Sequence, residues 1–223
     1  MSNETTQSST VTPFGTTKIW GKVDEIEYEG VVQGPSTQTT PLQVACLFEY
    51  VEGDIFNPPA LPAELNGMVH LDSALDGLIT AMRSSGQFEG RELETLHLQP
   101  PKGKISADQL LLIGLGNRNM FSVDLMIAVS RTALREALRL GVTSYSFAAD
   151  IKDAGVESVP NELSERIVQG AVEAYRVQLM LQSKAMTSFK PLTKISLLAG
   201  TAFFVTAGTG ILNKITEYNS LKL

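Results

Sequence analysis

The sequence predicts an α/β fold in which parallel strands are joined by helices. Apolar runs of strand length occur at Leu42–Tyr50 and Asp108–Ile113, as in strands that are buried on both faces. An amphipathic helical pattern covers Ser122–Leu140. From Leu93 onward the patterns alternate as strand, strand, helix, strand, helix, strand, which indicates helical crossovers between parallel strands, with antiparallel strands expected near the start.

The composition fits a globular protein of one domain, or one domain plus an appendage. The chain has 223 residues, of which 43% are hydrophobic and 19% charged, and its formal net charge is −6. This acidic balance argues against a nucleic-acid binder, which usually has a basic face. One cysteine excludes an internal disulfide and a cysteine-rich zinc site, and two histidines leave little for a histidine-based metal centre. We therefore expect neither a metal nor a cofactor.

The N-terminal segment predicts a flexible tail over residues 1–17. It is rich in Ser and Thr and has neither a basic nor an apolar region, which disfavours a secretory signal. A cytoplasmic location is the expectation, and a lone thiol is compatible with it. Residues 18–32 alternate in polarity and predict one half-exposed strand, and Gly34–Pro41 predicts a turn.

The next segment predicts a buried strand and then a helix. Leu42–Tyr50 contains Cys46, which we interpret as a small core residue. Asn57–Pro62 is predicted to be irregular, because proline fixes φ and lacks an N–H. One helix is predicted next, ending at Ser84–Gly86, because five apolar residues share a face: Leu71, Leu75, Leu78, Ile79 and Met82.

Two acidic residues of this helix leave two interpretations open. Asp72 and Asp76 are four residues apart, so they could pair as acid and base. Alternatively, they lie in the first turns because the helix dipole favours acidic side chains there. His97, on a short predicted strand at Leu93–Leu98, is interpreted as a surface residue.

The second half of the chain predicts two long helices. The first covers Ser122–Leu140, with Ser122 as N-cap and Gly141 as the stop. Its arginines recur every four residues, on a solvated face or as an anion site: Arg131, Arg135 and Arg139. After a strand at Val142–Ala148, Pro160 opens the second helix, in which Gly170 indicates close packing against a neighbour.

The last segment has two interpretations. Leu192–Ala199 predicts a final strand, and Phe203–Tyr218 predicts a final helix. However, Ile195–Asn213 carries no charge and has the length of a membrane span. Its serines, threonines and glycines dilute that signal.

One loop has the composition of a ligand site. Gly114-Leu115-Gly116 follows a buried strand and precedes a helix, where a backbone can approach a phosphate. The pattern is G-x-G-x-x-N without the third glycine, so a tight strand-to-helix turn is the alternative. The candidate ligand-binding residues are Gly114, Gly116, Asn117 and Arg118. The sequence contains no H-E-x-x-H, G-x-S-x-G or C-x-x-C motif, and we assign no catalytic residue.

Residues 71–148 resemble the N-terminal domain of the leucine aminopeptidase (cytosol aminopeptidase) family, and the resemblance extends over roughly residues 20–215. It rests on an ordered set of motifs: LDxALxGLI from Leu71, S-G-x-F-x-G at Ser85–Gly90, I-G-L-G at Ile113–Gly116, L-G-V at Leu140–Val142 and GAVEAYR at Gly170–Arg176.

The resemblance implies a three-layer macro-domain-like α/β fold, a mixed sheet flanked by helices. Residues 18–190 would form this domain, and residues 191–223 would be an exit strand and a C-terminal helix that lead toward a catalytic domain. Many macro domains bind ADP-ribose, which favours the loop Gly114–Asn119 as a ligand site by analogy of fold.

The family's peptidase chemistry belongs to a C-terminal domain that binds two metal ions through motifs such as N-T-D-A-E-G-R. That motif is absent, and the chain ends at Leu223, about where that domain would begin. We expect a stand-alone, non-catalytic binding or assembly module, with an aminopeptidase-like protein partner or a second copy of the chain. The alternatives are a nucleotide or ADP-ribose binder, and a domain tethered to a membrane through residues 195–213.

Overall fold

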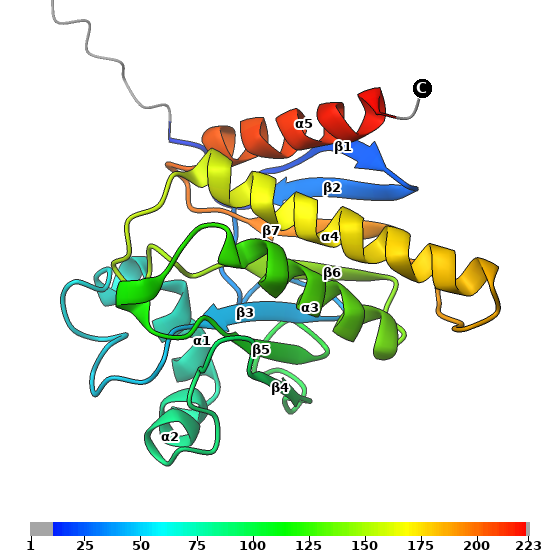
Figure 1. Cartoon of the computed structure of the whole chain (residues 1–223). Helices are drawn as coiled ribbons and strands as arrows, with labels where there is room; N and C mark the ends of the chain where they lie inside the picture. The colour runs from blue at the N-terminus through cyan, green and yellow to red at the C-terminus, as the bar shows by residue number, and fades with distance from the viewer. Residues whose placement is uncertain (1–10, 222–223) are drawn as a thin grey trace, which may run out of the picture.

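The computed structural model describes residues 11–221. In this part of the chain, one seven-stranded sheet has the strand order β1-β2-β7-β6-β3-β5-β4 (Figure 1). The strands are β1 Thr17–Val23, β2 Ile26–Val31, β3 Gln43–Leu47, β4 Thr95–Leu98, β5 Leu110–Gly114, β6 Ser144–Ala148 and β7 Lys194–Leu198. The edge strands β1 and β4 are antiparallel to their neighbours, whereas the inner strands are parallel.

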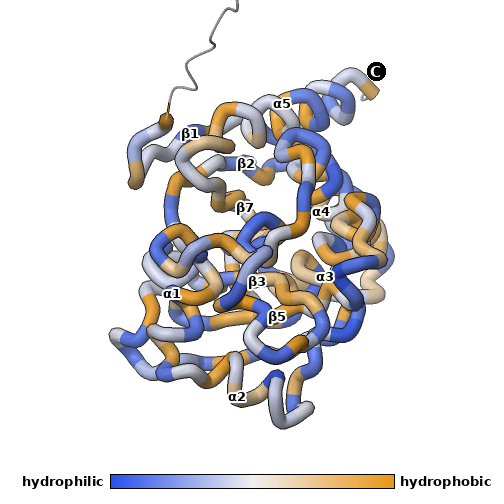
Figure 2. The backbone as a smooth tube through the Cα atoms, turned by 90° about the vertical axis from the view of Figure 1, so that its left-hand side faces the viewer, coloured by the Kyte–Doolittle hydropathy of each residue, from blue (hydrophilic) through white to orange (hydrophobic). Residues whose placement is uncertain are grey.

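Helices cover both faces of the sheet. They are α1 Gly67–Ala74, α2 Leu78–Ser84, α3 Leu125–Arg139, α4 Pro160–Ser183 and α5 Phe204–Ser220, with short 3₁₀ turns η1 Ala63–Leu65 and η2 Arg118–Met120. Figure 2 shows α1 on one side of the strands and α3 and α4 on the other. The predicted three-layer α/β fold with a mixed sheet is confirmed.

Two apolar clusters fill the spaces between the layers. The larger lies under α3, α4 and α5, and it receives Leu111 and Ile113 of β5. The smaller lies under α1 and α2, and it receives Leu110 and Leu112 of the same strand. Because its side chains alternate between two cores, β5 is apolar at every position, as the sequence indicates.

Residues 18–32 form two strands where the sequence predicts one. The chain reverses at Asp24 and Glu25, whose φ angles are 49° and 71°. Two consecutive left-handed residues make the tight hairpin turn that joins β1 to β2, and Val23 pairs with Ile26 across it. The alternation in polarity continues through the turn, so it conceals the break.

The single helix predicted over Leu71–Met82 is two helices. The chain leaves the helical conformation at Asp76 and Gly77, both of which have positive φ. The buried Asp72 carboxylate accepts the N–H groups of Ile79 (2.8 Å) and Thr80 (3.1 Å), and so caps the start of α2. Asp76 instead pairs with Lys104 (2.5 Å). Separate partners for Asp72 and Asp76 favour structural roles over an acid–base pair.

The start of α3 is three residues later than predicted. Leu125 and Met126 donate to the carbonyls of Ser122 and Val123, which are i to i+3 bonds of a tighter turn. Gly141, with φ of 72°, ends this segment as predicted. The close packing predicted at Gly170 is also present, since a methyl group there would overlap the backbone of α3 at Ile127.

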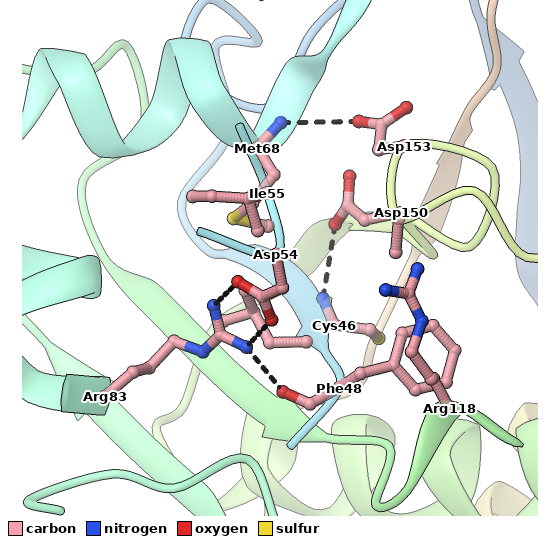
Figure 3. Close-up of a pocket in the computed structure, with 11 residues that line it drawn as sticks. Cys46, Phe48, Asp54, Ile55, Met68, Arg83, Arg118, Asp150 and Asp153 are labelled. Atoms are coloured by element: carbon pink, nitrogen blue, oxygen red, sulfur yellow. Dashed lines mark hydrogen bonds and ion pairs between the residues drawn. The ribbon is translucent and has the colours of Figure 1, made fainter. Parts of the chain in front are cut away.

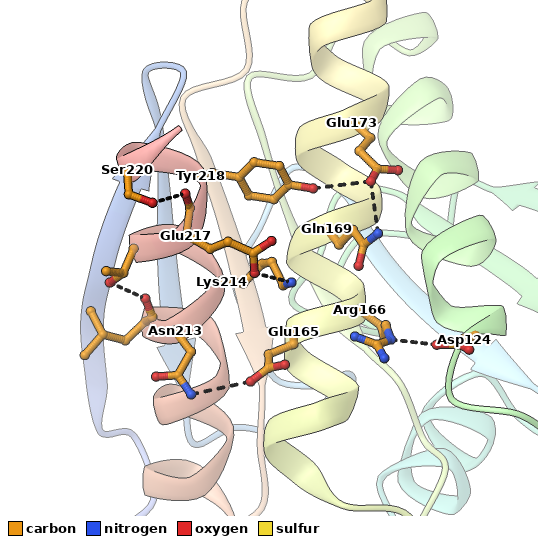
Figure 4. A network of polar contacts seen from close by, with 12 residues as sticks. Asp124, Glu165, Arg166, Gln169, Glu173, Asn213, Lys214, Glu217, Tyr218 and Ser220 are labelled. Atoms are coloured by element: carbon orange, nitrogen blue, oxygen red, sulfur yellow. Dashed lines mark hydrogen bonds and ion pairs between the residues drawn. The ribbon is translucent and has the colours of Figure 1, made fainter. Parts of the chain in front are cut away.

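Polar contacts tie the three covering helices together (Figure 4). Gln169 and Tyr218 both donate to the Glu173 carboxylate, which links α4 to α5. Arg131 of α3 pairs with the same carboxylate, and Arg139 pairs with Glu136. Two arginines of the predicted stripe therefore have carboxylate partners within the chain.

Residues 195–213 belong to the α/β domain, which corrects their interpretation as a membrane segment. They comprise β7, which lies between β2 and β6, a short loop, and the first turns of α5, which packs on β1. Gly208 allows this packing, because a methyl group there would overlap the Trp20 ring. Among residues 11–221, no helix is long and apolar enough to cross a membrane.

The predicted tail extends only partly into the described residues. Residues 1–10 lie outside them. Within residues 11–17, the N–H of Thr12 donates to the carbonyl of Thr201, and the N–H of Gly15 donates to Val32 (2.8 Å). These bonds place the segment along the ends of β2 and β7.

Candidate functional site

A crevice lies at the carboxyl ends of β3, β5 and β6 (Figure 3). It is lined by Cys46, Leu47, Phe48, Asp54, Ile55, Met68, Arg83, Arg118, Asp150, Asp153 and Ala154. Beside β3 the connections change sides, because α1 and α2 lie on one face of the sheet and α3 on the other. Open α/β sheets bind ligands at such a switch point.

One side of the crevice carries two carboxylates from the loop after β6. Asp150 is half-buried, and its Oδ2 accepts the N–H of Cys46 (3.2 Å). Burial raises the pKa of the Asp150 carboxyl well above its usual range, and the nearby Asp153 raises it further. Burial likewise raises the pKa of Asp153, against the opposing effect of hydrogen bonds from Met68 and Gly67.

Arg118 faces these carboxylates from η2, the turn that follows β5 (Figure 3). Its Nη2 atom is buried and has no hydrogen-bond partner among residues 11–221. A buried guanidinium donor without a partner is costly, because it has lost its bonds to water and gained none. It therefore marks a position where an incoming acceptor would be stabilised.

A buried ion pair forms another wall. Arg83 of α2 binds Asp54 with two parallel bonds (Nη1–Oδ1 3.0 Å, Nη2–Oδ2 2.6 Å) and also donates to the Phe48 carbonyl (2.8 Å). The two side chains are only 1% and 9% exposed. This bidentate geometry holds the loop after β3 against α2.

Of the four predicted ligand-binding residues, only Arg118 lines the crevice. The N–H groups of Gly114 and Gly116 donate to Glu94 (2.8 Å) and Gly90 (2.9 Å), so other parts of the chain already use them. The side chain of Asn117 accepts the N–H of Asn119 and caps η2. Ligand contact by all four stays a prediction.

The close backbone approach expected at Gly114 is present, but with another part of this chain. A methyl group on Gly114 would overlap the Arg91 carbonyl, and Gly90 lies similarly close to Phe48. The segment around Gly90 and Arg91 thus occupies the space beside the Gly114–Gly116 loop.

No sequence motif singles out the two carboxylates of the crevice, Asp150 and Asp153. Asp150 and Asp153 come directly after the predicted strand Val142–Ala148, at the edge that also carries Arg118. Polar residues just past a parallel strand are a usable signal, because the carboxyl ends of parallel strands share one edge. The Arg83–Asp54 pair has no such signal, since its partners are 29 residues apart.

The crevice carries no recognisable metal centre. Within residues 11–221, no group of three or more His, Cys, Asp or Glu side chains is placed to hold a metal ion. His97 lies on edge strand β4 and shares a hydrogen bond with the Gln109 side chain (2.9 Å).

A wider, mostly apolar hollow of about 470 Å³ lies between the α1–α2 junction and the segment after β4. The ion pair of Asp76 and Lys104 contributes to its lining. Among the side chains that line it, none is a buried polar group without a partner. Of these two hollows, the crevice is therefore the one that carries a buried polar group without a partner.

Comparison with known proteins identifies relatives by sequence. A family profile described as "Cytosol aminopeptidase family, N-terminal domain" matches residues 55–184, more than half of the chain. A probable cytosol aminopeptidase of Alkaliphilus oremlandii is 32% identical over 107 residues, which cover 48% of this chain and 21% of that protein. One of Roseiflexus castenholzii is 31% identical over 102 residues, 46% of this chain and 19% of that protein. The match spans about a fifth of these relatives.

Solved structures show the same fold. A mutant of tomato leucine aminopeptidase matches with a TM-score of 0.59 and 19% identity, over 89% of this chain and 36% of that one. A mutant macrodomain of Oceanobacillus iheyensis also has a TM-score of 0.59, with 14% identity, over 96% and 100% of the two chains. That macrodomain with ADP matches with a TM-score of 0.54 and 16% identity, over 93% and 98%. The macro-domain-like fold expected from the sequence is confirmed.

Proposed function

The chain belongs to the cytosol aminopeptidase family through its N-terminal domain, and from this premise we propose that it is a non-catalytic binding module whose binding site is the crevice. The observation that carries the proposal is the buried Nη2 of Arg118, which has no partner among residues 11–221. It lies in one crevice with Asp150 and Asp153. The cytoplasmic location expected from the sequence stays a prediction.

The chemistry of the crevice favours a nucleotide-like ligand. The guanidinium of Arg118 suits a phosphate oxygen, since arginine binds phosphate with charge-assisted hydrogen bonds. The carboxylate of Asp150 suits a hydroxyl or amino donor, such as a ribose hydroxyl. A nucleotide offers both groups in one molecule. The ADP bound to the Oceanobacillus macrodomain supports the same ligand class.

Thermal unfolding with and without ADP-ribose or ADP tests this proposal. A ligand that binds only the native state raises its unfolding temperature, so millimolar ADP-ribose is expected to raise that of the wild-type chain by several degrees. Arg118→Ala is expected to lose most of this rise, and Arg139→Ala, an arginine paired with Glu136 elsewhere, is expected to keep it. No rise in the wild type contradicts the ligand class, and an equal rise in Arg118→Ala contradicts the site.

The non-catalytic part of the proposal has its own assay. The purified chain, incubated with manganese or zinc ions and a leucyl chromogenic substrate, is expected to release no product above the buffer rate. Sustained turnover that scales with protein concentration would contradict it. Bovine serum albumin at equal mass is a suitable control for metal-catalysed hydrolysis.

Assembly with an aminopeptidase catalytic domain is a second candidate function. Loops at the carboxyl edge of the sheet expose large apolar side chains, which mark protein contacts when they gather on one side. These residues are Val51, Phe56, Met120, Val159 and Phe203. Co-elution with such a domain in size-exclusion chromatography is expected, and weaker co-elution for Met120→Ser, since Met120 is 81% exposed. Separate elution at micromolar concentrations contradicts this role.

A further inference from the structure

Two loops that contribute to the lining of the crevice are hydrogen-bonded to each other. The loop after β3 and the loop after β6 are joined here by main-chain and side-chain hydrogen bonds, over residues 57–68 and 150–155, which we call the clasp. The N–H of Leu61 donates to the Asp153 carbonyl (3.0 Å), and the Asn66 side chain donates to the same carbonyl (3.1 Å). The Asp153 carboxylate accepts the N–H of Met68 (3.3 Å).

Asn66 is the central residue of the clasp. It is fully buried, and its amide group also donates to the carbonyls of Ile55 (3.2 Å) and Leu61 (3.4 Å). Its Oδ1 accepts the N–H groups of Met68 and Val69, at the start of α1. One side chain thus connects the loop after β3, the loop after β6 and a helix N-terminus.

The clasp also fits together tightly at the backbone. Gly155 has a φ of 73° and lies against Pro59, where a methyl group would overlap the Pro59 carbonyl. With the clasp closed, the free space in the crevice is about 10 Å³, enough for about one water molecule. Pockets that hold drug-sized or nucleotide-sized ligands measure roughly 300–1,000 Å³. A ligand of that size enters only if a wall of the crevice moves.

The walls differ in how firmly they are held. The floor is made by β3 and β6, whose residues at this end are buried in the sheet. The wall at Arg83 is fixed by the buried bidentate pair with Asp54. The clasp consists of the two loops, the turn η1 and the first residues of α1, joined by hydrogen bonds. Such peripheral segments open locally at lower free energy than core strands do.

We propose that the clasp is the gate of the crevice, which opens to admit the ligand and closes over it. This inference rests on the proposed function insofar as it takes the crevice as the binding site. Asn66 and Asp153 act as positioning residues, because they hold the two loops together. The free energy of clasp opening then sets both the rate of ligand entry and the ligand affinity.

Cys46 provides a direct probe of opening. It is the single cysteine of the chain, it lines the crevice, and it is only 1% exposed. Its rate of modification by methyl methanethiosulfonate, followed by mass spectrometry, reports how often the crevice opens, with no ligand present.

Two variants loosen the clasp in different ways. Asn66→Ala removes the connecting side chain, and Gly155→Ala removes no hydrogen bond but forces Pro59 away. Ser130→Ala is the matched control, because it removes one buried hydrogen bond, from Ser130 to the Ile167 carbonyl (2.6 Å), between α3 and α4. Urea unfolding of each variant identifies conditions in which all remain folded.

At least fivefold faster modification of Cys46 is expected in Asn66→Ala and Gly155→Ala, and a change below twofold in Ser130→Ala. Unchanged modification in both clasp variants overturns the gate, and so does an equal acceleration in the control, since the thiol would then be exposed by general loosening. Faster modification of Cys46 in the clasp variants, without binding of ADP-ribose to the wild type, would support the gate and contradict the proposed ligand class.

Discussion

At the scale of single residues, the crevice places two acidic side chains in surroundings that resist their ionisation. Burial and mutual repulsion raise the pKa of Asp150 above its unfolded value. Below the usual aspartate pKa of about 3.9, both the folded and unfolded states hold the proton and there is no cost. As the pH rises through the window between the unfolded and folded pKa values, the unfolded state releases its proton first. Asp150 therefore lowers the free energy of unfolding as pH rises, and the cost persists above both values.

Asp150→Asn is consequently expected to stabilise the protein at pH 7.5, because it removes the cost of ionising a buried carboxyl. The asparagine Oδ1 can still accept the N–H of Cys46. Urea unfolding at pH 7.5 and pH 3.5 measures the effect, which is expected to vanish at the lower pH. Asp108→Asn, at an exposed carboxylate, is the control. A variant that is less stable than the wild type at pH 7.5 would refute this assignment.

Breaking the buried ion pair of Arg83 and Asp54 is expected to destabilise the protein, in contrast to Asp150→Asn. Arg83→Ala leaves Asp54 in the protein interior without its guanidinium, which typically costs about 3–5 kcal/mol. Arg91→Ala breaks an exposed pair with Glu89 and is expected to cost less than about 1 kcal/mol. Chemical denaturation compares the two. Similar losses in both variants would show that burial of the Arg83 pair does not matter.

At the scale of elements, the helix and strand boundaries that the sequence did not predict lie at tight backbone turns. Apolar spacing located the helical face from Leu71 to Met82, but it could not show that the Asp72 side chain caps a second helix seven residues later. Polarity likewise continued through the β1–β2 turn at Asp24 and Glu25. Both breaks depend on residues with positive φ, which hydrophobic periodicity does not report.

At Gly170, close packing between α3 and α4 is expected to outweigh the higher helix propensity of alanine. In an exposed helix, replacing glycine by alanine usually stabilises by about 0.5–1 kcal/mol. At Gly170 of α4, the added methyl would overlap the Ile127 carbonyl of α3, so Gly170→Ala is expected to destabilise by about 1–3 kcal/mol. Gly34→Ala, where the nearest atom beyond its chain neighbours is 3.9 Å away, is the control in thermal unfolding. A stabilising Gly170→Ala would contradict the close α3–α4 contact.

At the scale of the whole molecule, the order of strands and helices from Leu93 onward was predictable and the crevice was not. Continuous apolar runs such as Asp108–Ile113 indicate inner parallel strands, and the family resemblance supplied the three layers. The crevice instead depends on which strand ends become neighbours. Cys46 and Asp150 are 104 residues apart and meet because β3 pairs with β6. Local sequence patterns carry no information about that pairing.

The sheet order also explains why the charged side chains of the crevice lie at one edge of the sheet. Because β3, β5 and β6 run in parallel, the loops that carry Asp54, Arg118 and Asp150 leave the sheet on the same side. The exposed apolar side chains that favour a protein partner lie on loops of this edge too. Ligand and partner are therefore expected to affect each other's binding.

Changes in the backbone amide NMR signals of the isotope-labelled protein show where ADP-ribose binds, and so test whether the crevice is a nucleotide site. The crevice site predicts saturable changes at Cys46, Arg118 and Asp150, with small changes at the apolar hollow around Leu78 and Gln99. Changes confined to that hollow, or no changes at millimolar ADP-ribose, would contradict a nucleotide-binding crevice.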